Sequence, residues 1–161
     1  MSRVLNVLFL CSGNSGRSIM AEAILQHNGA GKFAAFSAGS HPTGRINPLS
    51  LEQLASEGFP TEALYSKSWL TFADAHAPRM DFIIGVCDKV ANQEHPVWPG
   101  RPIHLWWHFP APGAVQGSDA QVRAAFRAVS QELQVMLRQF IAAPYDEAAL
   151  TRLNVAQNAS R

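Results

Sequence analysis

The sequence has few of the features that mark secreted, membrane or nucleic-acid-binding proteins. Its 161 residues include only two cysteines, Cys11 and Cys87, too few for a disulfide scaffold, which favours a reducing, cytoplasmic compartment. No apolar run approaches the roughly 20 residues that a membrane-spanning helix needs. The 13 basic and 12 acidic residues leave a formal net charge of +1, so no overall field attracts nucleic acid or a membrane surface. We therefore expect one globular domain with a single core.

Strand-like and helix-like segments alternate along the chain. The expected strands, which are nearly continuous apolar runs, are residues 4–10, 33–37, 82–87 and 103–107. The expected helices are residues 18–27, 47–57, 71–77 and 118–140. The last of these opens on a capping box and repeats apolar residues at steps of three and four. This order indicates an α/β fold, an open parallel four-stranded sheet with helices on both faces, over residues 1–143, with a C-terminal tail at 144–161.

The most informative segment joins the first expected strand to the first expected helix. It begins at Cys11 and ends at Arg17 and Ser18. The residues between, expected to bind an oxyanion together with Arg17, are Ser12, Gly13, Asn14, Ser15 and Gly16. The glycines permit backbone angles that turn successive N–H groups inward, and the guanidinium can pair with two oxygens at once. We expect this electropositive surrounding to lower the pKa of the Cys11 thiol and make it a nucleophile.

Two other interpretations of this segment compete with an anion-binding active site. A cysteine and an arginine at this spacing occur by chance in many proteins, and cysteines at strand ends are often buried structural residues. Here the preceding strand and the following helix supply the context that a phosphate-type loop requires. The run before Cys11 also faintly resembles a lipoprotein cleavage box, but Asn6 interrupts it and makes a poor signal core.

Cys87 lies at the end of the third expected strand. The carboxyl ends of parallel strands meet at one edge of a sheet, where ligands bind, so Cys87 and Cys11 should share that edge. Neighbouring strands lie about 4.8 Å apart, and a disulfide needs Cα atoms within roughly 7 Å. The pattern favours a pair of thiols for redox chemistry. The other interpretation is a small buried apolar residue in a central strand.

Several stretches, in order over about residues 4–142, carry a family resemblance. They are 11–18 with the following Met-Ala-Glu-Ala-Ile-Leu, then 36–42, 47–48, 66–69, 80–82, 86–88 and 96–100. Together they resemble the low-molecular-weight phosphotyrosine phosphatase superfamily and, within it, the arsenate reductases. The resemblance implies a four-stranded parallel sheet flanked by helices.

The resemblance also implies roles for individual residues. Cys11 corresponds to the nucleophile, Arg17 to the oxyanion clamp, Ser18 to the hydrogen-bond partner of the thiolate and Asn14 to a loop-stabilising residue. Cys87 matches the position of a second thiol in family reductases. The implied reaction reduces arsenate to arsenite with no bound cofactor or metal. An external thiol, glutathione with glutaredoxin or thioredoxin, completes the cycle.

Two positions depart from the family pattern. Reductases with an internal cysteine relay carry another cysteine near the stretch preceding Pro96, where this chain reads Asn92-Gln93-Glu94-His95 and has no thiol. Ala111 stands where the family has an aspartate as general acid. Asp119, Asp88 and His108 are the candidates to replace it. A phosphotyrosine phosphatase and a catalytically degenerate oxyanion-binding protein therefore remain alternatives to the reductase.

Two smaller features complete the sequence evidence. His104 and His108 are four residues apart, but an expected strand and a proline-rich loop carry them, so a metal site is not expected. The aromatic residues Trp98, Trp106, Trp107 and Phe109 form either core packing or an apolar rim around the anion site.

Overall fold

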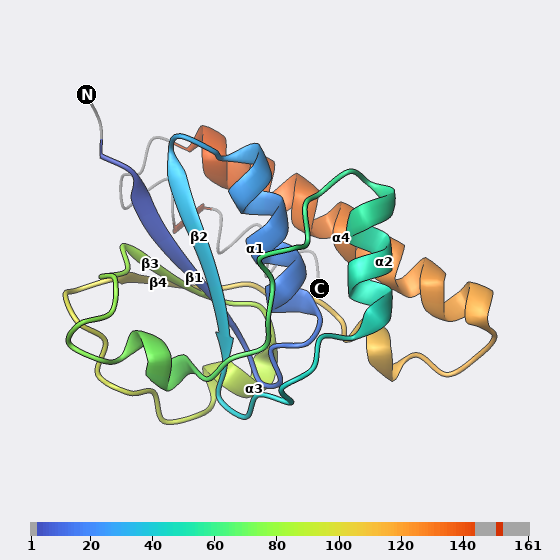
Figure 1. Ribbon diagram of the computed structural model, residues 1–161, viewed down its shortest axis with the longest axis horizontal. Coiled ribbons are helices and arrows are strands. Elements are labelled where there is room, and N and C mark those ends of the chain that lie inside the picture. Colours follow the sequence, from blue (N-terminus) through green and yellow to red (C-terminus); the bar gives the residue numbers. More distant parts are fainter. Residues whose placement is uncertain (1–2, 144–150, 153–161) are drawn as a thin grey trace.

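The computed structural model describes residues 3–143 and 151–152 and contains a four-stranded sheet (Figure 1). The strands are β1 (Leu5–Cys11), β2 (Phe33–Gly39), β3 (Phe82–Gly85) and β4 (Ile103–Trp106). They are ordered β2-β1-β3-β4, and every neighbouring pair is parallel. The predicted fold class is thereby confirmed. Because β1 lies between β2 and β3, the loop that follows β1 emerges at the middle of the carboxyl edge.

The helices agree with the predicted ones to within a few residues, with one exception. They are α1 (Arg17–Asn28), α2 (Pro48–Ser56), α3 (Asp88–Ala91) and α4 (Asp119–Ala142), with 3₁₀ helices η1 (Trp69–Phe72) and η2 (Pro112–Ala114). The helix predicted at 71–77 is wrong, because the chain forms only η1 there. The Asp74 carboxylate accepts a hydrogen bond from the His76 N–H, a local turn that competes with a helix.

Different elements cover the two faces of the sheet. Figure 1 shows α1, α2 and α4 gathered on one side, where Phe140 of α4 packs against Phe33 and Phe82 at ring distances of 5.2 and 5.1 Å. On the other face η1 and loops take the place of longer helices, with Phe36 against Phe72 at 5.6 Å. Helices were predicted on both faces, and the two faces differ in how they are covered. One face carries α1, α2 and α4, whereas the other carries the 3₁₀ helix η1 and loops.

The aromatic residues of the fourth-strand region belong to the core. Trp98, Trp107 and Phe109 are buried, and Trp107 packs against Phe140 at 5.9 Å. Trp106 packs against His95 at 5.3 Å on the opposite face. Core packing, one of the two interpretations of this segment, therefore accounts for these side chains.

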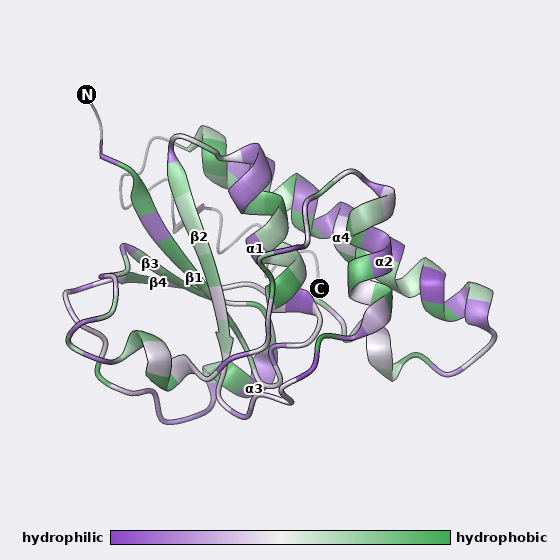
Figure 2. Ribbon diagram, in the orientation of Figure 1, coloured by the Kyte–Doolittle hydropathy of each residue, from purple (hydrophilic) through white to green (hydrophobic). Residues whose placement is uncertain are grey.

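The longest helix, α4, begins at the predicted capping box. The Ser118 hydroxyl accepts from the Gln121 N–H, and the Gln121 side chain accepts from the Ser118 N–H. Apolar and polar residues alternate along the helix, as expected when one side packs on the core (Figure 2). None of the helices in the described residues is long and apolar enough to cross a membrane. The tail predicted at 144–161 lies outside the described residues apart from 151–152.

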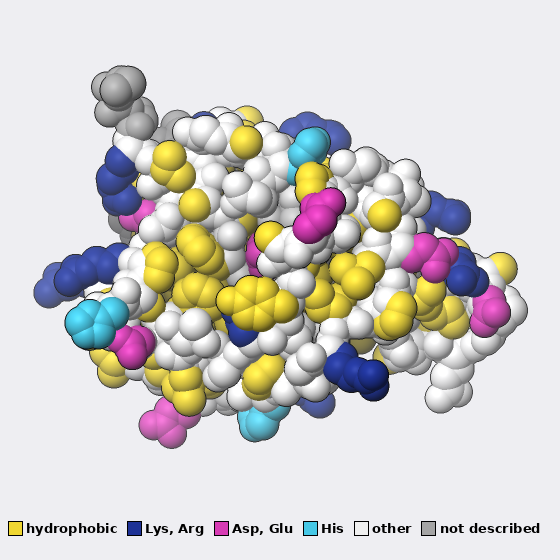
Figure 3. Space-filling view, viewed as in Figure 1, with side chains coloured by type: hydrophobic (Ala, Val, Ile, Leu, Met, Phe, Trp, Pro, Cys, Tyr) yellow, Lys and Arg dark blue, Asp and Glu magenta, His cyan; other side chains and the backbone are white. Residues whose placement is uncertain are grey.

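Charged side chains form no field of one sign on the face seen in Figure 3. Lysine and arginine lie around its periphery together with aspartate and glutamate, and apolar side chains occupy its middle. Basic and acidic side chains, which are nearly equal in number in the sequence, are thus also mixed on this face of the molecule.

Gly85 offers a test of how closely β3 and β4 pack. A Cβ at this position would lie 2.2 and 2.3 Å from two ring carbons of Trp106. We expect Gly85→Ala to lower the free energy of unfolding by about 1–3 kcal/mol, because the indole ring must shift. Gly113→Ala is the control, since its Cβ would have its nearest contact at an ordinary 3.5 Å from Asn47. Equal denaturation midpoints for the two variants would contradict the packing described.

Candidate active site

The loop between β1 and α1 is held from outside through its carbonyl oxygens. Backbone N–H groups of the following segment bond three of these oxygens. The pairs are His41 to Ser12 at 2.8 Å, Thr43 to Gly13 at 3.0 Å and Asn47 to Ser15 at 2.9 Å. In a planar trans peptide the N–H points away from its carbonyl. The N–H groups of residues 13, 14 and 16 therefore point to the inner side of the loop, where an anion can accept from them.

The left-handed position of the loop is Asn14. Asn14 has φ of 47°, a conformation that asparagine tolerates better than most residues. Neither Gly13 nor Gly16 has a positive φ, but Gly16 has φ of −137° and ψ of −92°, outside the α and β regions, so an unusual backbone angle does occur at one of the two glycines. The Asn14 side chain is fully buried and turns away from the pocket, where it donates to Ser18 at 2.9 Å and to Ser37 at 3.0 Å.

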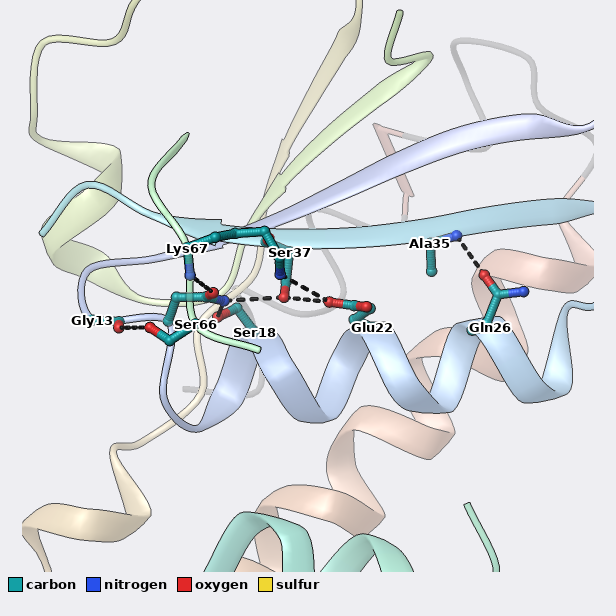
Figure 4. Close-up of polar contacts among 9 residues, drawn as sticks. Gly13, Ser18, Glu22, Gln26, Ala35, Ser37, Ser66 and Lys67 are labelled. Carbon is teal, nitrogen blue, oxygen red and sulfur yellow. Dashed lines mark hydrogen bonds and ion pairs between the residues drawn. The ribbon is translucent and has the colours of Figure 1, made fainter. Parts of the chain in front are cut away.

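A buried polar network continues from Asn14 beneath the loop (Figure 4). The Asn14 side-chain oxygen accepts from the backbone N–H of Lys67, and Ser37 donates to Glu22 at 2.5 Å. The Lys67 ammonium lies 3.7 Å from Glu22 and donates to the Ser37 carbonyl. Burial raises the pKa of Glu22 and lowers that of Lys67, and their pairing opposes both shifts. The network joins β2, α1 and the segment before η1 to the loop.

Ser18 lies at the base of this network. It is fully buried, and its hydroxyl oxygen accepts the hydrogen bond from Asn14. The structure thus places it directly under the loop, in the first turn of α1. Its role as a hydrogen-bond partner of the thiolate stays a prediction.

Arg17 begins α1 and lines the pocket above the loop. Its Nη1 donates to the Phe109 carbonyl at 2.8 Å, which fixes one edge of the guanidinium and leaves the other N–H donors for an anion. Gly16 at the N-cap has no side chain to cover the helix end. The positive end of α1 and the guanidinium therefore act on the same space.

The two sulfur atoms meet at the floor of this pocket. β3 ends at Gly85, and a bond from the Val86 N–H to the Leu10 carbonyl, 2.9 Å, continues its alignment with β1. Cys87 and Cys11 are both buried and unbridged, both line the pocket, and their thiols lie close enough for each to shift the pKa of the other. The expectation that the two cysteines share one edge agrees with this structure.

The two thiols are coupled in their ionisation. The interaction with Cys11, helped by the backbone N–H groups of Val90 and Ser12, lowers the pKa of Cys87 to about 5 despite burial. The same interaction, and then burial, raise the pKa of Cys11. The pair therefore holds one negative charge and one proton between its two sulfur atoms. The role of Cys11 as the nucleophile stays a prediction.

The pocket has a volume of about 480 Å³, within the range of small-molecule sites. All residues of the predicted loop except Asn14 line it, together with both cysteines. Ala111 also lines it, so the segment with the missing carboxyl does face the anion site. Of the three candidate replacements, Asp88 lines the pocket and His108 bonds to Asp88 at 2.9 Å. Asp119 lies instead in the first turn of α4.

The described residues contain no cluster of three or more His, Cys, Asp or Glu side chains able to hold a metal ion. His104 packs against His95 and Trp106, at ring distances of 6.4 and 6.0 Å. The two histidines at four-residue spacing thus have separate surroundings.

Sequence reasoning missed two parts of the site. One is Lys67, whose contact with the loop uses its backbone N–H. The other is the Phe109 carbonyl that holds Arg17. Neither leaves a side-chain pattern in the sequence, although Lys67 lies in one of the stretches that carry the family resemblance.

Residues 6–152 match the family model of the low molecular weight phosphotyrosine protein phosphatases. The chain belongs to this family. It is 29% identical over 136 residues to a glutaredoxin arsenate reductase from Synechocystis sp., covering 84% of this chain and 95% of the relative.

Two solved structures extend the comparison for this family member. One is an arsenate reductase in the phosphate binding state, with a TM-score of 0.66 and 26% identity over 86% of this chain and 98% of the other. The second is a thioredoxin-dependent arsenate reductase from Corynebacterium glutamicum, with a TM-score of 0.60 and 30% identity over 85% of this chain and 62% of the other. The predicted resemblance is confirmed, and these similar proteins are arsenate reductases.

Because the two cysteines share one negative charge, the pH at which a thiolate first forms can be predicted. We expect the ultraviolet absorbance of thiolate to rise with a midpoint near pH 5, the value to which the Cys87 pKa is lowered. Cys11→Ala should move the midpoint upward, because it removes the main hydrogen bond to the Cys87 thiolate. Cys87→Ser should also change the midpoint, because Cys11 then titrates beside Arg17 without the neighbouring thiol that raises its pKa. An unchanged midpoint in Cys11→Ala would show that the two sulfurs do not interact as described.

Proposed function

We propose that this protein is an arsenate reductase that reduces arsenate to arsenite through Cys11 and Cys87. The observation that carries the proposal is that two free thiols, at the adjoining ends of β1 and β3, line one anion-binding pocket. A phosphatase needs one nucleophilic thiol, whereas reduction of arsenic by two electrons needs two. The reductases among the similar proteins support the same conclusion.

The first step joins sulfur to arsenic. Arsenate occupies the loop, where the inward N–H groups, the end of α1 and Arg17 bind its oxygens. The Cys11 proton passes to Cys87, and the Cys11 sulfur attacks arsenic. An S–As bond forms, an As–O bond breaks, and the departing oxygen leaves as water after taking protons.

The second step transfers the electrons. Cys87 has given the proton it received from Cys11 to the departing oxygen, and its sulfur, again a thiolate, attacks the Cys11 sulfur. A disulfide forms, and the pair of electrons of the S–As bond stays on arsenic, which falls from the pentavalent to the trivalent state. Each arsenite released requires the oxidation of two thiols to one disulfide. The two electrons that arsenic gains therefore come from the two sulfur atoms.

An external thiol must then reduce the Cys11–Cys87 disulfide. The chain has no third cysteine for an internal relay, and residues 92–95, near which the resemblance places one, contain no thiol. The His95 side chain bonds to the Val90 carbonyl at 2.8 Å and ties down the segment after α3. Glutathione with glutaredoxin and thioredoxin are the two candidate donors, supported by the glutaredoxin and thioredoxin-dependent relatives. Both donors act in the cytoplasm, the location we propose.

Phosphatase activity is the second candidate, because the family is named for it. Ala111 argues against it. Hydrolysis of a phosphate ester has to protonate a poor leaving group, and losing a general acid costs roughly 10²–10⁴-fold in rate. The pocket-facing position of Ala111 means that this loss falls at the site itself.

A coupled assay tests the proposed function. Arsenate is supplied with glutathione and glutaredoxin, or with thioredoxin and its reductase, and NADPH consumption is followed. We expect turnover with one of the systems, none with Cys11→Ser, and loss of the thioredoxin-coupled cycle with Cys87→Ser. Normal turnover of Cys87→Ser with glutathione would contradict the role of the second thiol.

Phosphate binding and ester hydrolysis separate the alternatives. Folded protein that binds phosphate and yet reduces no arsenate with either system contradicts the reductase assignment. Hydrolysis of p-nitrophenyl phosphate that increases in Ala111→Asp would then indicate a weakened phosphatase. Phosphate binding with neither activity would indicate a degenerate oxyanion-binding protein.

A further inference from the structure

The pocket lacks a carboxyl at position 111 but has one elsewhere in its lining. Among the described residues that line it, Asp88 is the one with a carboxyl group, and Arg17 and Lys89 carry positive charge. Asp88 directly follows Cys87, which lines the same pocket as Cys11. A carboxyl thus lies one residue from the second thiol of the site.

His108 holds Asp88 in this position. Its Nδ1 lies 2.9 Å from each of the two carboxylate oxygens, in a charge-assisted contact. The imidazole itself is fixed by its neighbours in the chain. Trp107 and Phe109 are 1% and 2% exposed, so the backbone on both sides of His108 is anchored in the core.

The same anchored segment also positions the anion clamp. The Phe109 carbonyl accepts the hydrogen bond from Arg17, and His108 precedes Phe109. One short stretch of backbone therefore sets the guanidinium on one side of the oxyanion and, through His108, the carboxyl on another. The His108 side chain is 33% exposed, which lets solvent return a proton to it.

We propose that Asp88 is the general acid of the arsenate reaction, resupplied with a proton by His108. The inference rests on the proposed function. As the S–As bond forms and the As–O bond breaks, the protonated Asp88 carboxyl gives its proton to the departing hydroxyl oxygen of the arsenate, which already holds the proton from Cys87 and leaves as water. His108 passes its Nδ1 proton to Asp88 and is itself reprotonated by solvent. Only protons are transferred in this step, and arsenic stays pentavalent until Cys87 attacks Cys11.

This arrangement replaces the carboxyl that Ala111 lacks. Asp88 would touch the departing oxygen and is the catalytic residue, while His108 acts through Asp88 as a positioning residue and proton source. The acid is suited to arsenate, a small oxyanion that fits between the two sides of the pocket.

The test measures arsenite formed by reduced protein in a rapid-quench single turnover, before any external thiol acts. We expect Asp88→Asn to slow arsenite formation by about 10² or more, the usual range for loss of a general acid. Inhibition by phosphate should be no weaker, because the substitution removes a negative charge near the anion. Glu94→Gln, an exposed carboxyl on the loop after α3 and outside the pocket lining, is the matched control and should keep the wild-type rate.

A second variant tests His108 without altering the carboxyl. His108→Ala should be slow, and added imidazole should restore the rate, because the partly exposed site admits a small proton donor. A structural role for the side chain would not respond to imidazole.

The outcomes are distinguishable. Wild-type speed in Asp88→Asn, or an equal loss of rate and phosphate affinity, overturns the assignment of the acid. Failure of imidazole to restore His108→Ala overturns the proton supply by His108. Wild-type protein that forms no arsenite contradicts the proposed function itself.

Discussion

The outward hydrogen bonds of the loop carbonyls are the interaction on which the site depends. Three carbonyls between Cys11 and Gly16 are bonded from outside, and this turns the N–H groups of the same peptides toward the anion. Asn14 completes the arrangement from below. Its left-handed backbone is fixed by a side chain that bonds to Ser18, Ser37 and Lys67. The polar network beneath the loop is thus the support of a preorganised anion site.

One contact between two sulfur atoms serves two successive purposes. In the free enzyme the two coupled thiols share one negative charge and one proton. During the proposed reaction the same proximity allows the two atoms to form a disulfide. The register of β1 and β3, with Leu10 opposite Gly85, brings the two cysteines together without a large movement of either strand.

The sequence predicts much of the fold because its signals are local. The apolar run before Cys11, the caps of α2 and α4, and the loop residues are all readable over a few positions. Long-range contacts were harder to predict. The bond from Arg17 to the Phe109 carbonyl spans 92 positions and uses a backbone atom, which no side-chain pattern reveals. Which sulfur bears the charge likewise depends on donors from two separate segments, at Ser12 and Val90.

The central claim is that two thiols of one chain deliver both electrons to arsenic. The most direct measurement mixes fully reduced protein with excess arsenate, without any other thiol, and determines the arsenite formed and the mass of the chain. The account predicts one arsenite per chain and the loss of two hydrogens, with a disulfide mapped to Cys11 and Cys87. No arsenite, with both cysteines still free, would contradict it.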